Sequence, residues 1–195
     1  MDLPVWRNRM TLLNNCRVAI LATNGFEEAE LIEPMNALKE AGAEVSVLSL
    51  ESGEIQGLIK DREKGLRVKV DHEIRDVSPD DFDAVHLPGG TVNADTMRMV
   101  PEVQSFLQKM QADNKPISAI CHAAWELVSA GLVRGRNLTS YHSIQDDIKN
   151  AGGNWDDQSV VRDDNWVTSR KPDDLPEFIP SMLNLFSRYP IHSRT

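Results

Sequence analysis

Hydrophobic residues occur in short runs that alternate with stretches of helical spacing along most of the chain. Short, continuous apolar runs are typical of strands that are buried on both faces of a parallel sheet. Between them, apolar positions recur every three or four residues, as on one face of a helix. This alternation predicts a mostly parallel sheet covered on both faces by helices. The expected strands are 16–22, 44–50, 83–87, 115–120 and 166–169, and the longer expected helices are 27–41, 101–113 and 174–187.

The segment 51–76 is less regular. Gly53, Gly57 and Gly65 interrupt it, and 66–71 alternates between apolar and polar residues like a half-exposed strand. We therefore expect a hairpin-like excursion from the main sheet. The remaining expected elements are a capped helical turn at 78–82, a helix that ends at Gly131, a brief strand at 138–141, a helix at 144–151 and a strand at 155–162.

Composition indicates one soluble domain. The 195 residues are 41% hydrophobic and 26% charged, with a net charge of −9 and a pI near 5.0. No basic run is available for nucleic acid, and an acidic surface disfavours anionic membranes. The two cysteines, Cys16 and Cys121, form no disulfide framework, and no signal peptide or membrane-spanning run is visible, so we expect a cytoplasmic protein. We expect residues 1–15 to be an N-terminal extension and 16–190 to be a single domain.

Cys121 lies where the chain changes from strand spacing to helical spacing. The apolar run 115–120 ends at this residue, and Ala124 and Leu127 follow on a helical period. A residue on such a sharp turn has its side chain pushed outward, as in the nucleophile elbow of hydrolases. The positive end of the helix behind it favours thiolate over thiol, and the adjacent His122 can carry a proton. The alternative is that Cys121 is only a small buried hydrophobic residue.

Polar residues and glycines follow other apolar runs, at the strand ends where open α/β sheets bind ligands. Glu27 and Glu30 lie one helical turn apart, although acidic residues in a first turn also stabilise the helix dipole. Gly89 and Gly90 have two interpretations. They either form a tight turn that needs positive φ, or they direct a backbone N–H at a developing oxyanion. Tyr141 is either a pocket residue or a core or interface residue.

Five separated stretches form a pattern that is more specific than any one of them. They are Phe26–Leu31 (FEEAEL), Leu87–Gly90 (LPGG), Ala119–His122 (AICH), Thr139–Tyr141 (TSY) and Trp166–Arg170 (WVTSR). The pattern resembles the PfpI/ThiJ superfamily, most closely the PfpI-type intracellular cysteine peptidases and the related stress-response deglycases. The resemblance extends from Arg17 to Leu185, nearly the whole chain.

The resemblance implies a flavodoxin-like, three-layer sandwich with Cys121 as the nucleophile at the elbow. In this family the glutamate in the position of Glu30 lies against the cysteine sulfur, and Glu27 belongs to the same motif. A carboxyl beside a thiolate is driven toward its protonated form. The backbone N–H groups of Gly90 and His122 are expected to form the oxyanion hole. The expected substrate pocket includes Gly89, Trp125 and Tyr141.

Two positions depart from the family pattern. PfpI-type peptidases carry an acidic residue a few positions after the glycine pair, which reaches the Cys-His pair of a neighbouring subunit. The matching residue is Ala94, and neither Asp95 nor Asp81 is a clean replacement. Without this acid, His122 loses the group that fixes its tautomer and stabilises its charged form. The second departure is Trp125, which either narrows the pocket or packs at an interface.

Three functions remain open at this stage. The first is a stress-related hydrolase with deglycase or glyoxalase-like activity on reactive carbonyls or their protein adducts, through Cys121. The second is an intracellular cysteine peptidase, which demands more because an oriented His122 must protonate an amine leaving group. The third is a non-enzymatic redox sensor with an oxidisable Cys121.

No metal-ligand spacing and no nucleotide-binding loop is visible, so no cofactor is expected. The expected partners are a small carbonyl compound or a peptide as substrate, and at least one further copy of the chain in a homodimer or larger homo-oligomer. Nucleic acid and membrane partners are not expected.

Overall fold

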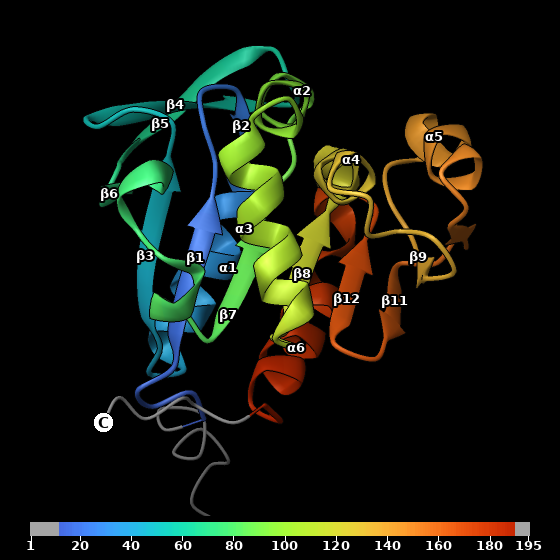
Figure 1. The fold of residues 1–195 in the computed structure, drawn as a ribbon. Coiled ribbons are helices and arrows are strands. Elements are labelled where there is room, and N and C mark those ends of the chain that lie inside the picture. Colours follow the sequence, from blue (N-terminus) through green and yellow to red (C-terminus); the bar gives the residue numbers. More distant parts are fainter. Residues whose placement is uncertain (1–11, 190–195) are drawn as a thin grey trace, which may run out of the picture.

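The centre of the molecule is a twisted sheet, seen in a computed structural model that describes residues 12–189. Over this range the main sheet has seven strands in the order β11-β12-β8-β7-β1-β3-β6 (Figure 1). All neighbours pair in parallel except β11 and β12, which are antiparallel. The expected mostly parallel sheet is therefore confirmed. The strands are β1 (Arg17–Leu21), β3 (Glu44–Ser49), β6 (His72–Glu73), β7 (Ala84–Leu87), β8 (Ile117–Ile120), β11 (Val160–Asp163) and β12 (Trp166–Ser169).

Helices cover both faces of this sheet, which confirms the three-layer, flavodoxin-like architecture (Figure 1). Consecutive residues of β1 alternate between the two cores: Val18 packs with α6, while Ala19 packs with α3 and α4. No helix within residues 12–189 is long and apolar enough to cross a membrane. The helices are α1 (Glu28–Glu40) and α6 (Leu175–Phe186) on one face, α2 (Thr91–Arg98), α3 (Pro101–Ala112) and α4 (Ala124–Ser129) toward the other, and α5 (Gln145–Asn150) near the β11 edge.

A smaller sheet projects beyond β1 and confirms the hairpin-like excursion. Strand β2 (Phe26–Glu27) pairs in parallel with β4 (Glu54–Ile59), and β4 pairs antiparallel with β5 (Glu63–Lys69). The tip of this hairpin is the Lys60–Asp61 turn, and both residues have positive φ. Short 3₁₀ turns connect other elements at Ile74–Asp76, Pro79–Asp81, Cys121–Ala123, His142–Ile144 and Pro172–Asp174.

Three elements differ from the sequence-based expectation. The expected strand 138–141 is only β9 (Asn137–Leu138), which pairs with β10 (Asn154–Trp155) outside the main sheet. The expected strand 155–162 is divided between β10 and β11, with no strand at 156–159. Helix α2 was not expected, because its sequence TVNADTMR is mostly polar and buries little apolar surface. The extension expected at 1–15 lies, up to residue 11, outside the described residues.

Glu126 on α4 is a carboxyl group inside the hydrophobic layer. It is 0% exposed, and neither of its carboxyl oxygens has a hydrogen-bond partner in the described part of the chain. The helix packs against α2, α3 and α5. Burial raises the pKa of Glu126 well above its usual value, so the side chain is protonated at neutral pH.

We expect Glu126→Met to stabilise the protein, and to do so more strongly as the pH rises. Below about pH 4 the carboxyl is protonated in both the folded and unfolded states. Above that pH the unfolded chain ionises while folded Glu126 does not, so the natural protein loses stability until the pH reaches the raised folded pKa. Removing the unpaired polar group should add about 1–3 kcal/mol near neutral pH.

Urea unfolding at pH 5 and pH 8 measures this effect. Glu126→Gln is the matched control, because it keeps an unpaired polar group but cannot ionise and should flatten only the pH dependence. An equal stability gain for the Met variant at both pH values would contradict the assignment of a protonated carboxyl.

Candidate active site

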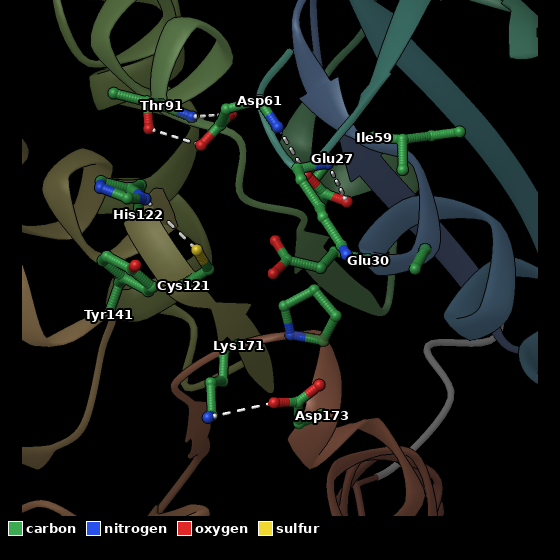
Figure 2. Close-up of a pocket in the computed structure, with 13 residues that line it drawn as sticks. Glu27, Glu30, Ile59, Asp61, Thr91, Cys121, His122, Tyr141, Lys171 and Asp173 are labelled. Atoms are coloured by element: carbon green, nitrogen blue, oxygen red, sulfur yellow. Dashed lines mark hydrogen bonds and ion pairs between the residues drawn. The ribbon is translucent and has the colours of Figure 1, made fainter. Parts of the chain in front are cut away.

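The carboxyl ends of β1, β7, β8 and β12 meet at one edge of the sheet. Five of the expected site residues, Glu27, Glu30, Cys121, His122 and Tyr141, line a cavity there (Figure 2). This cavity has a volume of about 600 Å³. Within the described residues, His, Cys, Asp and Glu side chains form no group of three or more that could hold a metal ion. The residues that line the cavity are Glu27, Ala29, Glu30, Ile59, Lys60, Asp61, Thr91, Cys121, His122, Tyr141, Lys171, Pro172 and Asp173.

Cys121 occupies a sharp turn between β8 and the helical segment behind it. The preceding Ile120 is extended, with φ −132°, whereas Cys121 has φ +64° in the left-handed region that non-glycine residues rarely adopt. This turn directs the thiol into the cavity, where the residue is 6% exposed. The Cys121 carbonyl accepts a hydrogen bond from the Tyr141 N–H at 3.1 Å, which ties the turn to the segment after β9. The expected elbow at the strand-helix junction is confirmed.

His122 lies beside the thiol and is enclosed by polar and aromatic groups. Its Nδ1 is 3.3 Å from the Cys121 sulfur, and its Nε2 is 3.4 Å from the Ser143 hydroxyl. The ring stacks on Tyr141 with 4.7 Å between centroids. Burial lowers the pKa of His122, while the negative charge of Asp61 acts in the opposite direction. The neutral ring therefore predominates at neutral pH and can accept a proton.

Glu30 is wholly buried against the thiol. One carboxyl oxygen accepts a hydrogen bond from the Gly89 N–H at 2.9 Å. A side chain at position 89 would collide with this carboxyl and come within 2.7 Å of the Cys121 Cβ, so only glycine fits. Gly89 therefore holds Glu30 in place and contributes nothing to the cavity wall.

The Glu30 carboxyl and the Cys121 thiol shift each other's protonation. Burial, and then the charge of Glu27, raise the pKa of Glu30 well above its usual value. Burial, and then the charge of Glu30, also raise the pKa of Cys121. Two adjacent buried groups cannot both be ionised cheaply, so the pair retains a proton at neutral pH. When Glu30 holds that proton, its charge no longer opposes the thiolate and its O–H can donate to sulfur.

Two backbone N–H groups are directed at the Cys121 sulfur. They belong to His122 and Gly90, and their hydrogen bonds lower the pKa of the thiol. Gly90 has φ +93°, and a Cβ there would collide with the Gly25 carbonyl and lie 2.6 Å from the Glu27 nitrogen. The turn therefore requires glycine and fixes the N–H direction. These two donors are the pair expected for an oxyanion hole.

Two of the expected residues lie away from the sulfur. The Glu27 carboxylate accepts hydrogen bonds from the backbone N–H groups of Lys60 and Asp61, at 3.1 and 3.2 Å, so it holds the β4–β5 tip. Trp125 does not line the cavity: its ring contacts His122 at 5.3 Å between centroids, and its N–H donates to Asp147 at 2.7 Å. This ring is on the side of α4 that faces α5.

Neither Asp95 nor Asp81 takes the place of the family's acid at position 94. Ala94 is on α2 and is wholly buried, so it faces the protein interior. Asp95 is exposed on the outer side of the same helix. Asp81 completes a capping box with Ser78, where its carboxylate accepts the Ser78 N–H at 3.1 Å. None of the three reaches the cavity.

Three residues that support the site were missed by sequence reasoning. Buried His86 bridges the Ser118 hydroxyl and the Glu30 carbonyl, both at 2.9 Å. Because a carbonyl only accepts, Nε2 carries the proton, and burial lowers the pKa of His86 to about 4. Buried Asn93 donates to the Gly89 carbonyl at 3.1 Å and so braces the glycine turn. Asp61 is the third supporting residue. It lies at a hairpin tip, where no pattern of hydrophobic residues could have placed it near the site.

Comparison with known proteins agrees with this arrangement. Residues 16–185 match the DJ-1/PfpI family. The chain is 42% identical over 169 residues to Deglycase PfpI of Pyrococcus furiosus, which covers 87% of this chain and 98% of that protein. It is 40% identical over 170 residues to the putative cysteine protease YraA of Bacillus subtilis, and the match covers 87% of this chain and 97% of that protein.

A solved structure shows the same fold. Drosophila melanogaster DJ-1beta superposes with a TM-score of 0.80 at 30% identity, over 88% of this chain and 90% of that one. The family match includes the strand-helix junction at Cys121 and the loops that surround it. The chain therefore belongs to the DJ-1/PfpI family.

Proposed function

We propose that the protein is a cysteine-dependent enzyme that acts on small reactive carbonyl compounds, or on their adducts with proteins, in a protective, deglycase or glyoxalase-like reaction. The observation that carries the proposal is the Cys121 thiol at the edge of a 600 Å³ cavity, with two backbone N–H groups directed at it and a buried carboxyl beside it. The name of the Pyrococcus furiosus relative, a deglycase, supports the same chemistry.

Methylglyoxal illustrates the reaction. The Cys121 thiolate attacks the aldehyde carbon, a C–S bond forms, and the carbonyl electron pair moves onto oxygen. The N–H groups of Gly90 and His122 stabilise this oxyanion, and protonated Glu30 delivers a proton to give a hemithioacetal. Neutral His122 then moves the proton from the carbon that bears sulfur to the adjacent ketone carbon. The hydroxyl proton passes to the former ketone oxygen, which leaves a lactoyl thioester on Cys121. Water hydrolyses the thioester to lactate and restores the thiol, so one water is consumed for each methylglyoxal.

A cysteine peptidase is the second candidate, and the name of the Bacillus subtilis relative favours it. Peptide hydrolysis requires a protonated His122 at the moment the amine leaves. Burial is the largest influence on the pKa of His122 and lowers it, and the charge of Asp61 offsets this effect only in part. The ring is therefore a better proton acceptor than donor, so we place carbonyl chemistry first. A third candidate, a redox sensor, needs only that peroxide oxidise the Cys121 thiolate to a sulfenic acid.

Mass spectrometry after incubation with methylglyoxal, and separately with hydrogen peroxide, tests these candidates. Consumption of methylglyoxal and formation of lactate, with the protein mass unchanged, supports the proposed enzyme. Cleavage of a casein substrate without methylglyoxal turnover would favour the peptidase. An oxygen adduct confined to Cys121, with no turnover of either substrate, would favour the sensor.

We also propose that the chain forms a homodimer. Exposed apolar side chains at Leu66, Val92 and Met99 support a contact surface on the side of the β4–β5 hairpin and α2. Closed dimers are the commonest soluble oligomers. Light scattering coupled to gel filtration at micromolar protein should give twice the 21.9 kDa chain mass, and a single chain mass at all concentrations would contradict the proposal.

A further inference from the structure

The β4–β5 hairpin tip reaches over the active-site cavity in a conformation that needs outside support. Lys60 and Asp61 have φ +54° and +56°, both left-handed, and the Arg62 N–H closes their turn by donating to the Ile59 carbonyl at 3.2 Å. Glycine and asparagine adopt this conformation readily, whereas lysine does so only at a cost. Figure 2 shows Asp61 between Glu27 and Thr91, at the mouth of the cavity.

Two carboxylates hold this tip to the rest of the site. Glu27 accepts the N–H groups of Lys60 and Asp61, as described above. The Asp61 carboxylate in turn accepts the Thr91 N–H at 2.9 Å and the Thr91 hydroxyl at 2.8 Å. The chain of contacts therefore runs from the end of β2, through the hairpin tip, to the first residue of α2.

This contact fixes one half of the oxyanion hole. Gly90 is the N-cap residue of α2 and has no side chain to cap it, so Asp61 supplies the missing acceptor from another segment. A carboxylate at a helix N-terminus is also favoured by the helix dipole. Because Thr91 follows Gly90 directly, holding Thr91 holds the Gly90 N–H that is directed at the Cys121 sulfur.

Asp61 and His122 line the same cavity, so the negative charge of Asp61 acts on the His122 ring. This charge opposes the effects of burial and of His142, which both favour the neutral ring. Asp95 is exposed on the outer side of α2 and Asp81 caps a 3₁₀ turn with Ser78, so neither of these two acids reaches the cavity. The charged and titratable groups that line the cavity or act on His122 are Glu27, Glu30, Lys60, Asp61, Cys121, Tyr141, His142, Lys171 and Asp173.

We propose that Asp61 is a positioning residue that serves this active site in place of the absent acid at position 94. Its carboxylate fixes the start of α2, and with it the Gly90 N–H, and it supplies the negative charge that stabilises His122 when the ring holds a proton. The proposal rests on the proposed function, in which His122 transfers a proton and Gly90 stabilises an oxyanion. Unlike an acid borrowed from a neighbouring subunit, Asp61 belongs to the same chain as the Cys121 that it serves.

Asp61→Asn separates charge from shape, and Thr91→Val is the matched control. The asparagine still accepts a hydrogen bond from Thr91 but has no charge, while the valine removes one hydrogen bond and leaves the Asp61 charge in place. We expect Asp61→Asn to lower the pKa of His122, measured by NMR, by roughly half a unit, because solvent screens this exposed carboxylate. In Thr91→Val the pKa of His122 should stay within roughly 0.2 unit of the original.

Activity should follow the same pattern. For Asp61→Asn we expect kcat/KM for methylglyoxal to fall about tenfold, with the acid side of the pH profile displaced together with the pKa of His122. Thr91→Val should lower kcat without displacing the profile. An unchanged pKa of His122 in Asp61→Asn, or a displaced pKa with full activity, would overturn the proposal.

A second route to the same answer is available if the variant or the activity assay fails. If Asp61→Asn fails to fold, the salt dependence of the natural protein is measured instead: 1 M salt should screen Asp61 and lower the pKa of His122 by a similar amount, and no change would overturn the proposal. If no variant turns over methylglyoxal, the proposed function fails. In that case the NMR titration of His122 still tests the charge of Asp61, and the alkylation rate of Cys121 still tests whether Asp61 holds the Gly90 N–H at the sulfur.

Discussion

Replacing Cys121 with alanine is expected to lower methylglyoxal turnover by a factor of roughly 10³ or more, because the C–S bond cannot form without the thiol. The matched control is Cys16→Ala, which removes the other cysteine. Cys16 is 3% exposed in the core beneath α6, and burial, together with the charge of Asp83, raises its pKa to about 12. This control should retain activity within about twofold where it is folded.

Alkylation measures the same distinction without a substrate. Iodoacetamide near neutral pH should modify Cys121 first, because its thiol lines the cavity and receives two N–H hydrogen bonds, whereas Cys16 has no such access. Peptide mapping by mass spectrometry identifies the modified cysteine. Faster modification of Cys16, or full activity in Cys121→Ala, would remove Cys121 from the mechanism.

The pair Glu30→Gln and Glu30→Leu is expected to show that Glu30 acts as a hydrogen-bond donor to sulfur. Glutamine keeps the acceptor for the Gly89 N–H and still donates to the thiolate, so the alkylation rate of Cys121 at pH 7 should change by less than about threefold. Leucine loses both bonds, which should raise the thiol pKa and slow alkylation by roughly tenfold, the equivalent of one pKa unit. It also leaves the buried Gly89 N–H unpaired, at a cost of about 1–3 kcal/mol of stability.

The pH dependence of Cys121 alkylation shows whether Glu30 helps or opposes the thiolate. Burial raises the pKa of Glu30, so the carboxyl keeps its proton to a higher pH than an exposed glutamate does and ionises as the pH rises through that raised value. Once ionised it repels the thiolate, and the reactivity of Cys121 in the natural protein should rise less steeply with pH than in Glu30→Gln. Faster alkylation in Glu30→Leu than in the natural protein at pH 7 would mean that Glu30 is already ionised.

The parts of the site that sequence reasoning located are those that directly follow apolar runs. Cys121 and Gly89 come after β8 and β7, whose carboxyl ends lie at one edge of the main sheet, and Glu30 lies in the first turn of α1, after β2 of the smaller sheet. The change of hydrophobic period marked the Cys121 turn because strand and helix are adjacent in the chain there. The family resemblance then predicted that Glu30 lies beside the Cys121 sulfur.

The remaining parts depend on tertiary contacts that leave no local pattern. Asp61 meets Thr91 across 30 residues, through a hairpin whose register is set by its pairing with β2. His86 is in the middle of a buried strand, where a single polar residue among apolar ones reads as part of the core. Trp125 follows the nucleophile in sequence but points to Asp147, because successive residues of a helix face different directions.

The left-handed backbone of Cys121 means that heat resistance and catalysis favour different residues at this position. A non-glycine residue in this region carries roughly 1–2 kcal/mol of conformational strain, which glycine does not. A library of variants sorted only by melting temperature would therefore favour residues that relax the turn and discard the thiol. Laboratory evolution of a more robust form would need selection for turnover in every round, since the most stable sequences at this turn would be inert.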